Sequence, residues 1–148
     1  AFEFQELKLY AGRVRRFLWK IYDEETELPV AIAAPDIIRA KLAVNIGGTP
    51  FLDLSNDPTE LAAGGSKVVV EDLGSINNPD PADDRPAKGH VYFAGGDTLN
   101  IASSWGAAEM QKRYWLDLAV YQASTGELKP FGRGRIVVAR SPGGNLGA

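Results

Sequence analysis

A histidine-dependent catalytic triad is the first chemistry to consider, because the 148-residue chain contains serines, many acids and a single histidine, His90. Such a triad would combine His90 with Ser103 or Ser104 and a carboxylate, but these residues stand at no spacing known for this kind of site. A histidine at the end of a strand, beside a loop, is the simpler interpretation. The chain has no cysteine, so it offers neither a thiol nucleophile nor a cysteine metal site.

Paired carboxylates form a second possible catalytic site, since a glycosidase needs only two acids on opposite sides of a sugar. The chain has 19 acids, and those that cluster stand in segments typical of turns. Acids usually lie in solvated turns, and no segment predicts a cleft that would bring two of them together. We therefore predict that the protein is not an enzyme and carries no cofactor. The two acidic turns contain Glu24, Glu25 and Glu27 in one case, and Asp80, Asp83 and Asp84 in the other.

The turn that contains Asp80, Asp83 and Asp84 could also bind calcium, which prefers clustered carboxylate and carbonyl oxygens. It lacks the Asp-x-Asp-x-Asp-Gly spacing of an EF-hand loop, which favours a plain solvated loop. The glycine pairs of the chain are typical of turns, and none is followed by a long helix, so no phosphate-binding loop is expected. We predict no metal site.

Two groups of arginines are the most suggestive surface feature, Arg13, Arg15 and Arg16 in one strand-like segment and Arg133 and Arg135 in another. If the two segments pair or neighbour, they would form a basic band that could bind nucleic acid or an acidic protein surface. The alternative is an edge strand that charge protects against stray pairing. The net charge is −3 and no aromatic ladder separates the arginines, so we favour the edge strand or a protein contact over nucleic acid.

Alternation of apolar and polar residues, the period of a half-buried strand, is the dominant pattern along the chain. It is clearest over 38–46, where Ile38 and Leu42 share one face, and over 114–121, where Tyr114 and Leu116 do the same. About seven or eight such segments with turns between them predict one all-β domain, a sandwich or a barrel. Because every strand has a polar face, we expect antiparallel sheets with one side in water. The other expected strands cover 2–9, 13–22, 50–54, 67–71, 90–93 and 134–138.

Short helical turns, a long loop and a tail complete the expected domain, which extends over residues 1–141. Asp57-Pro58-Thr59-Glu60 has the pattern of a helix start, so one helical turn is expected there, and a second short helical piece over 104–112. The segment 72–89 is rich in proline and acids, which predicts a long exposed loop. The glycine-rich residues 142–148 are expected to form a flexible C-terminal tail.

The three tryptophans divide into two expected roles. Trp19 and Trp115 lie inside alternating strands, so we expect both in the core. Trp105 lies in a Ser-Ser-Trp-Gly turn and is expected to be the most exposed of the three. Trp105 or Tyr92 could serve as a stacking platform for carbohydrate. For Trp105, we favour a hydrophobic plug that closes one end of the sandwich.

One stretch of sequence resembles a known family. The aromatic strand Arg16-Phe17-Leu18-Trp19-Lys20-Ile21-Tyr22-Asp23-Glu24 precedes Leu28-Pro29-Val30 and the alternating run Ile38-Arg39-Ala40-Lys41-Leu42. This order, within Gly12 to Leu42, resembles the amino-terminal immunoglobulin-like domain of phage baseplate upper proteins and related tail modules, and the segment 126–136 is similar to the last hairpin of that family. The strand pattern alone leaves a jelly roll open as well. The resemblance implies an antiparallel immunoglobulin-like sandwich and no catalytic residues.

The resemblance also implies a structural protein of a bacteriophage particle, assembled in the host cytoplasm, that contacts other copies of itself and neighbouring virion proteins. No fibre or receptor-binding segment follows in the sequence, which favours a capsid decoration, collar or baseplate component. The alternative is a sandwich that binds carbohydrate or another ligand. No apolar run approaches the roughly 20 residues that span a bilayer, so no membrane association is expected. The candidate contacts are Arg13, Arg15, Arg16, Arg133, Arg135, Asp80, Asp83, Asp84 and Trp105.

Overall fold

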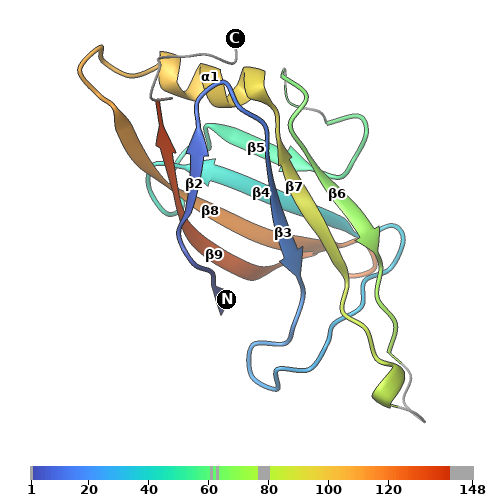
Figure 1. Ribbon diagram of the computed structural model, residues 1–148. Helices are drawn as coiled ribbons and strands as arrows, with labels where there is room; N and C mark the ends of the chain where they lie inside the picture. The colour runs from blue at the N-terminus through green and yellow to red at the C-terminus, as the bar shows by residue number, and fades with distance from the viewer. Residues whose placement is uncertain (1, 61, 63, 77–80, 141–148) are drawn as a thin grey trace.

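Two β-sheets pack face to face in the computed structural model, which describes residues 2–60, 62, 64–76 and 81–140 (Figure 1). The predicted all-β sandwich is therefore confirmed. The larger sheet contains, in spatial order, β1 (Phe2–Glu3), β9 (Glu127–Ala139), β8 (Gln111–Gln122), β4 (Ile37–Ala43) and β5 (Leu52–Ser55), with β2 (Leu7–Tyr10) also paired to β9. The smaller sheet contains β3 (Arg15–Lys20), β7 (Lys88–Phe93) and β6 (Lys67–Asp72).

The strand order matches that of an immunoglobulin-like sandwich. In one sheet, β9, β8 and β4 lie side by side as strands G, F and C, with β5 as C′, and in the other, β3, β7 and β6 lie as B, E and D. All of these neighbours pair antiparallel. The N-terminal strands differ, because β1 and β2 pair parallel with β9. The expectation of purely antiparallel sheets is wrong at this one edge.

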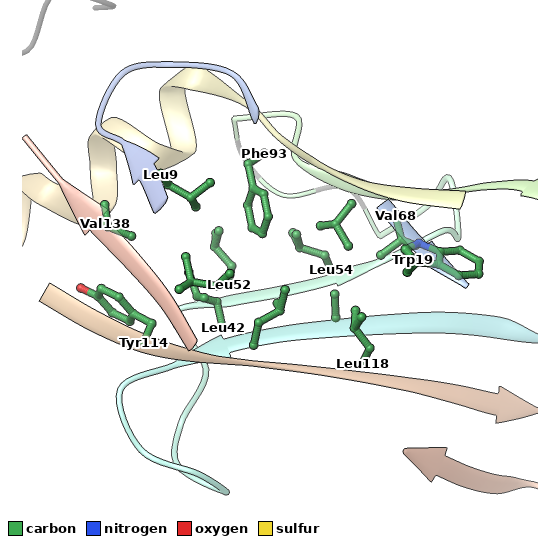
Figure 2. Close-up of a cluster of buried hydrophobic side chains, with 14 of the residues drawn as sticks. Leu9, Trp19, Leu42, Leu52, Leu54, Val68, Phe93, Tyr114, Leu118 and Val138 are labelled. Carbon is green, nitrogen blue, oxygen red and sulfur yellow. The ribbon is translucent and has the colours of Figure 1, made fainter. Parts of the chain in front are cut away.

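Apolar side chains from alternate strand positions fill the space between the sheets. Figure 2 shows Tyr114 and Leu118 of β8 and, across the core, Val68 and Phe93 of the smaller sheet. All four are buried, and so is Trp19 of β3, as predicted. The alternation along β8 is therefore the predicted one, with every second residue facing the core.

One α-helix, α1 (Gly95–Ser103), connects β7 to β8 across one end of the sandwich (Figure 1). It starts at a glycine pair where a turn was expected, and it forms because Ile101 and Ala102 are fully buried against the core. Tertiary burial of this kind outweighs the low helix propensity of glycine. The helical turns predicted after Asp57 and over 104–112 are wrong: the described residues after Asp57 form a turn, and the segment 104–112 contains turns followed by the start of β8 at Gln111. At Asp57 the carboxylate accepts the Thr59 N–H at 2.9 Å, which stabilises a turn instead of a helix.

The loop predicted over 72–89 is shorter than expected, because its ends belong to strands. Asp72 ends β6, and Lys88 and Gly89 lie in β7. Beyond the strands the chain continues as a hairpin arm, since Ser75 and Arg85 exchange two backbone hydrogen bonds of 3.0 and 2.8 Å. In Figure 1 the arm, which includes the 3₁₀ turn η1 (Pro81–Asp83), extends away from the sheets at the end opposite α1. A proline has no N–H group to donate to a β-ladder, but the residues on either side of the proline segment can still form ladder hydrogen bonds.

Two expectations concern residues that the structure does not describe: Asp80 and the flexible tail over 142–148. Within the described part of the chain, no helix is long and apolar enough to cross a membrane.

Candidate interaction surface

The two arginine groups lie in different sheets, so they do not form one hydrogen-bonded band. Arg13 lies in the turn before β3, and Arg15 and Arg16 begin that strand, whereas Arg133 and Arg135 belong to β9. β3 pairs with β7, and β9 pairs with β8, β1 and β2. β3 and β9 are nevertheless neighbours, because side chains from both line one groove at the open side of the sandwich.

The arginines of β9 lie on the outer face of the larger sheet. The Arg133 Nε–H donates to Asp117 Oδ1 at 2.7 Å, and the Arg135 guanidinium lies 4.9 Å from the centre of the Trp115 ring. Trp115 therefore faces outward, and the expectation that it belongs to the core is wrong. Its neighbours in β8 face inward, and successive side chains of a strand point to opposite faces. The arginine covers the exposed ring through a cation–π contact.

β3 is the edge strand of the smaller sheet, which supports the edge-strand interpretation of its basic residues. Arg15, Arg16 and Lys20 are exposed along it, and the strand contains no acid. Charged side chains on an edge oppose unspecific strand pairing. In the middle of the same edge, however, Leu18 is 73% exposed. The edge therefore combines a basic rim with an uncovered apolar side chain.

An apolar groove of about 350 Å³ opens beside this edge, between β3 and β9. Phe4, Phe17, Trp19 and Phe131 contribute aromatic rings to its lining. The ring centres of Phe4 and Phe17 are 4.6 Å apart, and those of Trp19 and Phe131 are 5.8 Å apart. The buried indole N–H of Trp19 has no hydrogen-bond partner among the described residues, which is unfavourable for stability. The groove joins three segments distant in sequence, so no local sequence pattern indicates it.

Glycines on the inner face of β9 leave the space in which the groove forms. Gly132 lines the groove, and a Cβ at Gly134 would lie 2.7 Å from Cζ of the Phe4 ring. In the Gly-Arg-Gly-Arg sequence of β9, the glycines thus leave the inward positions without a side chain, and the arginines point outward. Phe4 fills part of the space, because its backbone N–H donates to Arg133 O at 3.0 Å. A bulky residue at Gly132 would enter the groove, and one at Gly134 would collide with the Phe4 ring that lines it.

The described residues of the two acidic clusters lie in turns, as predicted. Asp83 is exposed and Asp84 half-buried near η1. The described residues contain no group of three histidine, aspartate or glutamate side chains that could hold a metal ion. In the other acidic turn, Asp23 accepts the backbone N–H groups of Thr26 and Glu25, each at 2.9 Å. These bonds, with the Thr26 N–H the stronger cause, hold the pKa of Asp23 below its ordinary value.

The residues considered for a triad have other partners. His90 Nδ1 lies 2.6 Å from Glu71 Oε1. The Ser103 and Ser104 hydroxyls donate to main-chain carbonyls of α1, each at 2.7 Å. The hydrogen bonds of the described residues do not link His90 to either serine. His90 lies inside β7, where it pairs with Leu18 of β3 and Val69 of β6, so the expectation that it ends a strand beside a loop is wrong.

Trp105 is a plug rather than a platform. Its side chain is 8% exposed, and its Nε1–H donates to Tyr114 Oη at 2.8 Å. The expectation that it is the most exposed tryptophan is therefore wrong, because the turn folds back over the end of the core. Tyr92, the other expected platform, has the Arg16 guanidinium 5.6 Å from its ring centre. A sugar could stack on that ring only by displacing the arginine.

The buried Tyr114 phenol should make the protein less stable in alkali. Burial raises the pKa of Tyr114, and the hydrogen bond from Trp105 opposes this shift. The unfolded chain releases the proton at the ordinary pKa of about 10, so this contribution to stability is present below that pH and is lost above it. We expect the free energy of unfolding, measured with urea at a series of pH values, to fall above pH of about 10.

Tyr114→Phe is the matched variant for this prediction. It should be less stable than the wild type at neutral pH by about 1–3 kcal/mol, because the Trp105 N–H loses its acceptor. The variant should also lack the alkaline decline that the phenol causes. Parallel curves for the two proteins would contradict the assignment of that decline to Tyr114.

The comparisons with known proteins add no family to this description: no protein-family model matches the chain, and no curated protein matches it.

Proposed function

We propose that the protein is a non-enzymatic structural component of a bacteriophage particle, with a capsid decoration, collar or baseplate role. It works by contact with other copies of itself and with neighbouring virion proteins. The immunoglobulin-like strand order agrees with the resemblance of Gly12–Leu42 to phage baseplate and tail modules. The observation that carries the proposal is the aromatic groove beside the basic edge of β3.

Two properties of this groove and the strand beside it favour a macromolecular partner. Its lining is largely aromatic, with Phe17, Trp19 and Phe131 among the contributors, and contiguous apolar surface with a polar rim marks sites of protein interaction. The strand beside it has a free edge, so a partner can add main-chain hydrogen bonds to side-chain contacts. In a particle such contacts repeat, and weak individual contacts then gain strength through multivalency.

The test is the composition of purified particles from the phage that encodes the chain. Quantitative mass spectrometry of gradient-purified particles should find this chain in a fixed molar ratio to the major capsid protein. A host protein of similar abundance in the lysate serves as the control for carry-over and should fall to background. A chain that stays in the soluble fraction and is lost with the host protein would contradict the proposal.

A further inference from the structure

We propose that the free edge of β3 and the adjoining groove bind an extended segment of a partner protein in which apolar residues alternate with acidic ones. This inference deepens the proposed function, and rests on it, because it states the chemistry of the partner. The partner segment adds to the smaller sheet as an extra strand, and its apolar side chains enter the aromatic groove.

The first argument is the vacant strand position. In a constant-type immunoglobulin sandwich the second edge of strand B pairs with strand A. In this protein the N-terminal strands β1 and β2 pair with β9 instead, so β3, the equivalent of B, has β7 as its one neighbour in the described sheet. Along an antiparallel strand, alternate residues direct N–H and C=O groups to each side. The side of β3 away from β7 therefore presents main-chain groups to an added strand.

The second argument is the apolar surface that an added strand would cover. Every second side chain of a strand on this edge points toward the space between the sheets, where Phe17 and Phe131 line the groove. Leu18 points the opposite way from Phe17, to the outer face of β3 that also carries Arg16 and Lys20, and its 73% exposed side chain would lie beside the outer face of an added strand. Large apolar side chains on one face of the partner fit this lining. A wholly polar segment would leave it uncovered.

The third argument is charge. Arg16 and Lys20 lie on the outer face of β3, which contains no acid, and opposite charges in directly facing positions of paired strands stabilise the pair. Glutamate or aspartate on the outer face of the partner therefore matches this edge. A second copy that adds its own β3 would place basic residues opposite basic residues, which is destabilising. The same repulsion rejects strands of the wrong charge and so supplies specificity.

The opposite edge of the smaller sheet lacks this combination. β6 carries both signs of charge, Lys67 together with Glu71 and Asp72. The groove beside β6 has no aromatic ring in its lining, which includes Asn56 and Asp57, whereas the groove beside β3 combines its aromatic rings with Lys20 and Glu27. The partner chemistry is therefore specific to the β3 edge, and the β6 edge provides a matched control.

The experiment uses the intact protein and a synthetic peptide of about six residues, the length of β3, in which glutamate alternates with phenylalanine. Titration of the labelled peptide, followed by fluorescence anisotropy, should give saturable binding. Hydrogen exchange should show new protection of β3 amides in the complex. A peptide with lysine in place of glutamate should bind at least about tenfold more weakly, since cross-strand charge pairs change sign. An N-methylated glutamate peptide should not bind, because it cannot form the main-chain ladder.

Protein variants locate the site. The double variant Arg16→Glu and Lys20→Glu should weaken binding of the glutamate peptide by about tenfold and favour the lysine peptide. Lys67→Glu on the exposed edge of β6 should leave both affinities unchanged. Circular dichroism spectra confirm that the variants are folded.

Four outcomes would overturn the inference. They are absence of saturable binding, equal affinity for the two charges, full binding of the N-methylated peptide, and an effect of Lys67→Glu equal to that of the double variant. Self-association of the protein that the glutamate peptide abolishes would instead assign the edge to a second copy and also overturn it. None of these results bears on whether the chain is part of a particle, which the mass spectrometry decides.

Discussion

Replacing Asp97 by alanine is expected to destabilise the domain by about 3 kcal/mol, because two backbone N–H groups lose a charged acceptor. The Asp97 carboxylate, 5% exposed, accepts the Gly64 N–H at 3.0 Å and the Ser66 N–H at 2.9 Å. The Ser66 Oγ in turn accepts the Ala94 N–H at 2.8 Å. A single carboxylate in the first turn of α1 thus fixes the segment that leads into β6 to the end of β7.

Urea unfolding at neutral pH measures this effect. Asp53→Ala is the matched control, since Asp53 is exposed on β5, and it should change the free energy of unfolding by less than about 0.5 kcal/mol. The free energy of unfolding of Asp97→Asn should lie between those of Asp97→Ala and Asp53→Ala. The asparagine amide oxygen still accepts one backbone N–H, while its NH₂ group faces the other N–H. Equal stabilities of the Asp97→Ala and Asp53→Ala proteins would show that the buried bonds contribute nothing.

Replacing Gly89 by alanine is expected to destabilise the domain by about 3 kcal/mol or more, at the upper end of the range for overpacked cores. Gly89 is buried in β7, the central strand of the smaller sheet. A Cβ there would collide with the main-chain oxygen of Val69 and would lie 2.6 Å from Cζ2 of Trp19. Neither neighbour can move freely, since Val69 belongs to the β6–β7 ladder and Trp19 is buried.

Gly106→Ala is the same chemical change at a site without neighbours. A Cβ at Gly106 meets nothing within 4 Å, so the substitution should be neutral or stabilise by about 0.5 kcal/mol through the unfolded chain. Thermal unfolding of the two variants provides the comparison. If Gly89→Ala unfolded at the wild-type temperature, Trp19 and β6 would have to be far more adaptable than their packing indicates.

Strands that bury one full face are predictable from the sequence, because apolar and polar residues then alternate along them with a period of two. β8 is the clearest case, with Leu116 and Leu118 buried between partly exposed neighbours. The same pattern was sufficient to place Trp115 correctly, since it stands between two inward residues. The expectation of a core tryptophan rests only on its place inside an alternating strand, and it does not use the face that the alternation assigns to Trp115.

Features that depend on contacts between distant segments were not predictable in this way. α1 was missed because glycines at its start indicate a turn, while its stability comes from Ile101 in the core. The local turn predicts an exposed Trp105, whereas the turn folds back over the end of the core and the indole N–H donates to the Tyr114 hydroxyl of β8. The groove forms only where Phe4, Phe17 and Phe131 come together from distant parts of the sequence, and no local sequence pattern indicates that contact.

The parallel pairing of β2 with β9 also sets the order in which the chain can fold during synthesis. Leu7–Tyr10 pair with Ile136–Ala139, so the first strands have no partner until the ribosome has made the last one. The β6–β7 and β8–β9 hairpins need only local contacts and can form earlier. The N-terminal strands therefore complete the larger sheet last. Until then the side chain of Leu9 and the unpaired edge of β9 stay uncovered, and exposed apolar surface and unpaired strand edges of this kind favour aggregation.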